Sequence, residues 1–157
     1  MNVKTEQEMI EFGRDFARTL TRPAVIELVG DVGAGKTTFA RGLAEGLGVN
    51  EAVTSPSFTI SKSYALPDGG RLVHYDFYRL NDPGIMVEDF AENLADPNNV
   101  VVVEWGESVE DLLPSEHIKV EIKYTEEGRE VIVWKYIYLE YQGLGWVHLR
   151  SWRRTRD

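Results

Sequence analysis

The sequence contains no cysteine. This absence excludes disulfide bonds, thiolate catalysis and zinc or iron–sulfur sites held by cysteine, and it fits the reducing cytosol. Histidine is scarce as well: His74, His117 and His148 lie far apart in the chain, so no helix can present a pair of them to zinc. The chemistry of this protein is therefore expected to depend on other side chains.

Long apolar segments are also missing. The longest unbroken apolar run covers residues 100–103, whereas a helix that crosses a membrane needs ~20 apolar residues. The first residues are rich in glutamate and lack the apolar stretch of a signal peptide. We therefore expect a cytoplasmic protein that makes no contact with a membrane.

Positive charge is in short supply. The 157 residues include 17 Lys and Arg against 26 Asp and Glu, a formal net charge of −9. An acidic protein repels phosphate backbones, so we expect no independent binding to nucleic acid, and phosphate must be bound through local geometry. The length is typical of one domain. We assign residues 1–140 to it and treat 141–157, with two tryptophans and an arginine cluster, as a tail of uncertain order.

The order of the predicted elements indicates an α/β protein. Helical periodicity predicts helices over residues 6–20, with Thr5 and Glu8 as a capping box, and over 37–47. A short apolar run predicts a buried strand over 25–29. Further strands are expected over residues 58–64, 72–76, 100–103, 118–124 and 131–138, and a further helix over 83–94. The expected fold is three-layer and P-loop NTPase-like, with a mostly parallel central sheet and additional antiparallel strands at one side.

Residues 30–37, Gly-Asp-Val-Gly-Ala-Gly-Lys-Thr, match the phosphate-loop pattern G-x-x-x-x-G-K-[ST] between a predicted strand and a predicted helix. Glycines let such a loop wrap closely, so that its N–H groups point at phosphate oxygens. Lys36 would contact the β- and γ-phosphates, the Thr37 hydroxyl would bind Mg²⁺, and Thr38 would lie near the α-phosphate. The nucleotide-binding residues expected here are Asp31, Gly33, Ala34, Gly35, Lys36, Thr37 and Thr38. The absence of an N-K-x-D guanine motif favours ATP over GTP.

Two predicted strands end in a carboxylate that suits a metal site. Glu104 follows a continuous apolar run, as expected of a central strand whose carboxyl end faces the ligand, so it is expected to serve the metal directly or through water. Asp76 follows a half-polar strand and is expected nearer the γ-phosphate, where it would orient the attacking water or help to hold Mg²⁺. We take Lys36, Asp76 and Glu104 as catalytic residues and Thr37 and Glu104 as metal ligands. Which carboxylate binds Mg²⁺ directly stays open.

Three further features each have two interpretations. The hydroxyl-rich segment 54–59 is either a switch that orders around the γ-phosphate or an ordinary Ser/Thr loop. Arg79 is either an arginine finger acting within the chain or the partner of a surface carboxylate. Trp105 either packs in the core or lies beside the switch.

Four segments taken together resemble the TsaE family of bacterial P-loop ATPases. They are residues 30–38, Thr-Ser-Pro-Ser-Phe-Thr at 54–59, His-Tyr-Asp-Phe-Tyr-Arg-Leu at 74–80 and Val-Glu-Trp-Gly at 103–106, in order and spacing over residues 3–137. The resemblance implies that Asp76 is the hydrolytic residue and that segment 54–59 is the switch. It also implies that Thr5 and Glu6 border the adenine and that Arg129 reaches the nucleotide. The segment beyond about residue 140 departs from the family pattern.

The resemblance also implies partners. Proteins of this family join TsaB and TsaD, which transfer a threonylcarbamoyl group to adenosine 37 of tRNAs reading ANN codons, and their ATP cycle resets the complex. We therefore expect a slow Mg²⁺-dependent ATPase that is a subunit of this complex and meets tRNA only indirectly. Two alternatives use the same loop. One is a small-molecule kinase, although no compact arginine lid is present outside the tail. The other is a nucleotide-gated binding module with negligible catalysis.

Overall fold

The computed structural model describes residues 1–78, 80, 82, 84–141 and 144–152, with side chains as far as Lys135. The elements in chain order are β1 (Asn2–Val3), α1 (Glu6–Ala17), β2 (Ala24–Val29), α2 (Lys36–Gly46), β3 (Ser61–Ala65), β4 (Arg71–Asp76), the 3-10 helix η1 (Gly84–Met86), α3 (Val87–Ala95), β5 (Val100–Glu104), the 3-10 helix η2 (Gly106–Leu112), β6 (Ile118–Thr125), β7 (Gly128–Tyr141) and β8 (Leu144–Trp152). In the described part of the chain, no helix is long and apolar enough to cross a membrane.

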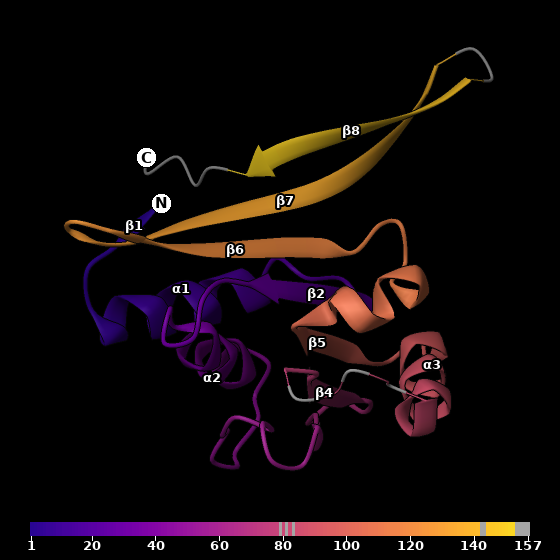
Figure 1. The fold of residues 1–157 in the computed structure, drawn as a ribbon, viewed down its shortest axis with the longest axis horizontal. Helices are drawn as coiled ribbons and strands as arrows, with labels where there is room; N and C mark the ends of the chain where they lie inside the picture. The colour runs from indigo at the N-terminus through magenta and orange to yellow at the C-terminus, as the bar shows by residue number, and fades with distance from the viewer. Residues whose placement is uncertain (79, 81, 83, 142–143, 153–157) are drawn as a thin grey trace.

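One mixed sheet forms the middle layer of the molecule (Figure 1). Its strand order is β1-β7-β6-β2-β5-β4-β3, with β8 paired to β7. The four central strands β6, β2, β5 and β4 run parallel, which confirms the predicted parallel centre. The antiparallel strands lie at both sides and not at one, because a short turn joins β3 to β4 and another joins β6 to β7.

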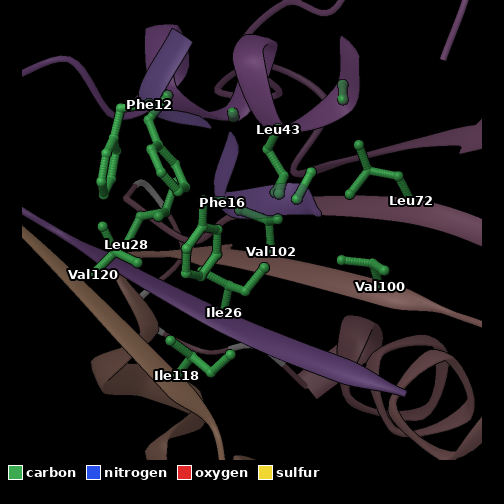
Figure 2. Close-up of a cluster of buried hydrophobic side chains, with 14 of the residues drawn as sticks. Phe12, Phe16, Ile26, Leu28, Leu43, Leu72, Val100, Val102, Ile118 and Val120 are labelled. Atoms are coloured by element: carbon green, nitrogen blue, oxygen red, sulfur yellow. The ribbon is translucent and has the colours of Figure 1, made fainter. Parts of the chain in front are cut away.

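The sheet is covered by helices on both faces, as the three-layer prediction requires. On one face, α1 and α2 pack with Phe12, Phe16 and Phe39 against apolar side chains of the central strands (Figure 2). On the other face, Phe90 of α3 and Val109 of η2 pack against the opposite side of β4 and β5. Strand β5 is buried on both faces because alternate valines point to opposite layers. Its last residue, Glu104, is buried as well.

Helix α1 begins where the capping signal predicts. The Thr5 hydroxyl accepts a hydrogen bond from the Glu8 N–H at 3.1 Å, and the Glu8 carboxylate accepts one from the Lys4 N–H at 2.7 Å. In a capping box the Glu8 side chain would accept from the N–H of the cap residue Thr5, but here it accepts from Lys4, the residue before the cap. The helix ends at Ala17, three residues before the predicted end at 20. Helix α2 begins at Lys36, directly after the glycine loop.

Three other predicted elements have clearly different bounds in the structure. The strand expected over 58–64 begins only at Ser61, because the N–H groups of Thr59 and Ile60 bond back to the Pro56 carbonyl and form a turn. The helix expected from residue 83 begins as α3 at Val87, and its predicted first residue lies outside the described residues. The strand expected over 131–138 is longer, and a partner strand, β8, follows it within the segment 141–157 that was expected to be a tail of uncertain order. Residues 142–143 and 153–157 of the predicted tail are outside the described part of the chain.

Candidate functional site

The glycine loop joins the carboxyl end of β2 to the first turn of α2. Gly33 has φ 78° and Gly35 has φ 114°, in the region that side-chain-bearing residues rarely adopt. At Gly30, an added Cβ would lie 2.6 Å from the carbonyl oxygen of Ile122 on β6, so the loop leaves β2 in close contact with the neighbouring strand. The three glycines thus allow a tight loop at the centre of the parallel sheet.

Lys36 is almost completely buried at the start of α2, with 6% of its surface exposed. Its ammonium group donates to the carbonyl oxygens of Gly30 at 2.6 Å and Asp31 at 2.9 Å, and it lies 4.9 Å from the ring centroid of Trp105. Among the described residues no carboxylate pairs with it. A buried charge without a counterion is costly unless a ligand supplies one, so this position suits an anion.

A cleft of about 440 Å³ opens beside the loop. Its lining comes from four parts of the chain: Val32, Gly33, Gly35, Lys36, Thr37, Thr38, Ser55, Ser57, Phe58, Asp76, Tyr78, Glu104 and Trp105. The cleft therefore brings together the predicted Lys36, Thr37 and Thr38 with both strand-end carboxylates. Part of the hydroxyl-rich segment 54–59 also lies in its wall.

Asp76 ends β4 and is 5% exposed. One carboxylate oxygen accepts a hydrogen bond from the Ser57 hydroxyl at 2.7 Å, and the other accepts one from the Tyr78 N–H at 3.0 Å. The Ser57 hydroxyl lies 2.6 Å from that of Ser55. Both partners of Asp76 thus belong to loops, one of them to the segment predicted as a switch.

Glu104 ends β5 beside Asp76 in the sheet register and is 3% exposed. Its Oε1 lies 2.9 Å from Nε2 of His74, which is buried within β4. Because a carboxylate only accepts, His74 Nε2 carries the donated proton. The other ring nitrogen, Nδ1, is buried without a partner among the described residues. His74 stands two residues before Asp76, and this spacing, which puts both on one face of the strand, is the signal that sequence reasoning passed over.

Two aromatic side chains close one side of the cleft. Trp105 follows Glu104 in a left-handed conformation, with φ 56°. Its ring centroid lies 4.8 Å from that of Tyr78, which is 54% exposed. Trp105 therefore lies beside Lys36 and Tyr78 rather than in the core, and Tyr78 is a cleft residue to which the sequence analysis gave no role.

Other predicted site residues are not part of the cleft lining. Arg129 donates from Nε to the Ala34 carbonyl at 3.1 Å. Thr5 caps α1, and Glu6 pairs with Arg41 of α2 at 3.0 Å. The described residues that line the cleft do not include Thr5, Glu6, Asp31, Ala34 or Arg129. Arg79, expected to be either an arginine finger or the partner of a surface carboxylate, lies outside the described residues.

The residues present fit Mg²⁺ bound together with phosphate rather than a metal held by protein alone. Within the described part of the chain, no three His, Asp or Glu side chains cluster closely enough to hold an ion. Mg²⁺ usually takes one or two protein oxygens and completes its shell with water and substrate phosphates. Thr37 and Glu104 supply one hydroxyl and one carboxylate in the same cleft.

A second Glu–His pair joins Glu27 of β2 to His117, the residue before β6. Nε2 of His117 is 3.3 Å from Oε2 of Glu27, and its Nδ1–H donates to the Pro114 carbonyl at 2.7 Å. The hydrogen bond to Glu27 raises the pKa of His117, and partial burial opposes this effect. The same bond, with help from Lys119, lowers the pKa of Glu27.

Deeper in the sheet, burial and the hydrogen bond to Asp89 raise the pKa of Tyr75.

These features define the class of protein: a P-loop NTPase-like α/β fold, with the glycine loop after the central parallel strand β2 and two carboxylates at the ends of β5 and β4, the next two strands on one side of it. The family described as "Threonylcarbamoyl adenosine biosynthesis protein TsaE" matches residues 3–131. The chain belongs to the TsaE family.

Individual relatives agree with this assignment. A tRNA threonylcarbamoyladenosine biosynthesis protein TsaE from Streptomyces coelicolor is 44% identical over 73% of this chain and 78% of its own length. The TsaE protein of Treponema pallidum is 36% identical over 83% of this chain and 96% of its own. A crystal structure of YdiB from Bacillus subtilis superimposes with a TM-score of 0.67 at 34% identity, covering 83% of this chain and 80% of that one. Family and fold thus rest on similarity over most of the chain.

Proposed function

We propose that the protein binds ATP with Mg²⁺ in the cleft beside the glycine loop and hydrolyses it slowly. The observation that carries this proposal is the buried ammonium of Lys36, which has only neutral carbonyls and a ring as described partners and faces the same cleft as Thr37, Asp76 and Glu104. A triphosphate would supply the missing negative charge.

Each side chain then has a distinct task. Lys36 binds the β- and γ-phosphates, while the Thr37 hydroxyl and the Glu104 carboxylate hold Mg²⁺, which neutralises charge on the phosphates when bound. Asp76 orients the attacking water and accepts its proton, and ADP leaves as the bond to the γ-phosphorus breaks. Ser57, bonded to Asp76, links this step to the segment 54–59.

We also propose that this ATPase serves tRNA modification as a subunit and not as the transferase. The family assignment supports a role in threonylcarbamoyladenosine synthesis. In the proposed complex, TsaB and TsaD modify adenosine 37 of tRNAs reading ANN codons in the cytoplasm. The net charge of −9 leaves contact with the tRNA backbone to these partners. The described lining of the cleft contains no arginine, so it offers limited charge stabilisation, and partners that close over it would speed hydrolysis.

The test is ATP hydrolysis by the purified protein alone and with TsaB and TsaD, together with repeated tRNA modification by the reconstituted complex. We expect slow hydrolysis alone, faster hydrolysis with both partners, and loss of repeated modification with Asp76→Asn. Phosphate transfer to a small-molecule acceptor would instead identify a kinase. Nucleotide-dependent binding of the partners without turnover would identify a binding module.

A further inference from the structure

The outer side of the glycine loop is held by two side chains from the β6–β7 hairpin. The Tyr124 hydroxyl donates to the carbonyl oxygen of Val32 at 3.1 Å. The Arg129 Nε donates to the carbonyl oxygen of Ala34, also at 3.1 Å. These two carbonyls belong to the residues on either side of Gly33. A stretch of loop that is exposed at Val32 is thus fixed from outside the cleft by residues far away in sequence.

Tyr124 and Arg129 form one unit. They are direct neighbours across the antiparallel pair β6–β7, and the Arg129 guanidinium lies 4.0 Å from the centroid of the Tyr124 ring. Arg129 also pairs in register with Val3 of β1, so the hairpin turn lies beside the N-terminal strand (Figure 1). The pair is therefore anchored in the sheet and not in a free loop.

This contact explains a glycine that the phosphate-loop pattern does not require. Gly33 has φ 78°, and an added Cβ there would lie 3.0 Å from the Tyr124 hydroxyl oxygen. A larger residue would both strain the backbone and press on the hydroxyl. Gly33 and Tyr124 are thus fitted to each other.

The direction of the two carbonyls decides where the neighbouring N–H groups point. In a planar trans peptide unit, the C=O of one residue and the N–H of the next point in opposite directions. A Val32 carbonyl held outward turns the Gly33 N–H toward the cleft, and an Ala34 carbonyl held outward does the same for the Gly35 N–H. Gly33 and Gly35 both line the cleft, whereas the intervening Ala34 N–H bonds within the loop to the Asp31 carbonyl at 3.0 Å.

We propose that Tyr124, stacked with Arg129, is a positioning residue that holds the phosphate-binding N–H groups of the loop in place before nucleotide arrives. The inference rests on the proposed function, because it assigns the pair to the phosphate part of that site. Preorganised donors bind an anion more tightly than donors that must first be ordered. Losing the tyrosine hydroxyl therefore weakens nucleotide binding although Tyr124 itself lies outside the cleft lining.

Tyr124→Phe removes one hydroxyl and keeps the ring beneath Arg129. We expect ADP and ATP affinity, measured by calorimetry, to fall about three- to tenfold, the effect of one net hydrogen bond, with turnover at saturating ATP unchanged. The matched control is Lys123→Ala, which removes an exposed side chain of the same strand that pairs with Glu121 at 3.1 Å and should leave affinity as in the wild type. Arg129 is the less decisive target, because a direct nucleotide contact is also expected of it.

A readout without nucleotide separates positioning from a general structural role. In the free protein, Tyr124→Phe should speed amide hydrogen exchange at Ala34, whose N–H bonds within the loop to the Asp31 carbonyl, by about three- to tenfold and leave the β6–β7 amides unchanged. Unchanged exchange, or wild-type affinity of the variant, would overturn the inference, as would an equal loss with Lys123→Ala. If the wild-type protein itself binds neither ADP nor ATP, the proposed function fails, and the exchange experiment still judges the role of Tyr124 in the loop.

Discussion

Strands β4 and β5 end side by side, and each ends in a buried carboxylate, yet different kinds of structure hold the two groups. Asp76 accepts its hydrogen bonds from Ser57 and from the Tyr78 N–H, both in loops. Glu104 receives its bond from His74, a residue of the sheet itself. Movement of the segment 54–59 would therefore reach Asp76 and leave Glu104 in place. This difference favours Asp76 as the hydrolytic group under control of the loop and Glu104 as the fixed metal ligand.

The largest loss of turnover with ATP binding retained should come from Asp76, the carboxylate held by loops. Asp76→Asn keeps the size of the side chain and removes its ability to accept a proton, so we expect hydrolysis to fall by about 10²–10⁴-fold. ATP affinity should stay within about threefold of the wild type, because only a contact of the transition state is lost. Single-turnover hydrolysis and calorimetry measure the two quantities. A comparable loss of binding would mean that Asp76, and not Glu104, holds the metal.

The next effect is on ATP affinity and concerns Lys36, the cation that shares the cleft with both carboxylates. Lys36→Ala removes a charged donor, which typically contributes about 1.5–3 kcal/mol, so ATP affinity should fall about 10–100-fold and hydrolysis should be lost. Calorimetry gives the affinity. Urea unfolding is the control, because the variant must retain a cooperative transition for the loss to be assigned to the site. Wild-type affinity for ATP would remove the phosphate-loop assignment.

The carboxylate held by the sheet should affect the metal more than the nucleotide. With Glu104→Gln, we expect the Mg²⁺ concentration needed for half-maximal ATP binding to rise about tenfold, because a metal site loses a charged ligand. Binding of ATP without Mg²⁺ should be close to that of the wild type. The comparison of Glu104→Gln with Asp76→Asn in the same Mg²⁺ titration decides which carboxylate serves the metal. If both variants shift the titration equally, the distinction between the two strand ends is wrong.

Much of this site follows from short-range patterns. The apolar run at 25–29, the glycine pattern and the helical spacing that follows are all local, and β2, the loop and α2 lie within one or two residues of the predicted bounds. The continuous run of valines before Glu104 likewise predicts a central strand, and β5 pairs with parallel neighbours on both sides. Parallel strands share their carboxyl edge, so the meeting of Asp76 and Glu104 in one cleft also follows from the predicted fold.

Contacts between segments that lie far apart in the sequence could not be predicted from short-range patterns. The bond of Tyr124 to Val32 depends on the register of β6 against β2, which no local pattern specifies. The same holds for His74, whose partner is on another strand. At 58–64, alternating residues predict a strand, but Ile60 has φ 67° because the chain turns back on the Pro56 carbonyl. The alternation of apolar and polar side chains predicts which face each residue occupies in a strand, and it carries no information about a backbone turn of this kind.

The smallest expected effect is a change in the pH dependence of stability, and it concerns the second Glu–His pair, Glu27 and His117. This pair differs from Glu104 and His74 in the hydrogen bonds of its histidine. Both ring nitrogens of His117 face acceptors, the Glu27 carboxylate and the Pro114 carbonyl, so the protonated ring is favoured. His74 has a partner at one nitrogen only, among the described residues. Stability that depends on pH between mildly acidic and neutral conditions is therefore expected from His117.

The signs of the two pKa shifts set the pH window. The pKa of His117 is raised above its ordinary 6.5, so its contribution to the free energy of unfolding is complete below 6.5 and is lost as pH rises through the raised pKa. The pKa of Glu27 is lowered below its ordinary 4.5, so its contribution is present above 4.5 and is lost as pH falls through the lowered value. The pair therefore stabilises the protein most between these two ordinary values. Urea unfolding from about pH 4 to about pH 9 should show a decline as pH rises above 6.5 that is smaller in His117→Gln. An identical decline in both proteins would show that the pair does not control it.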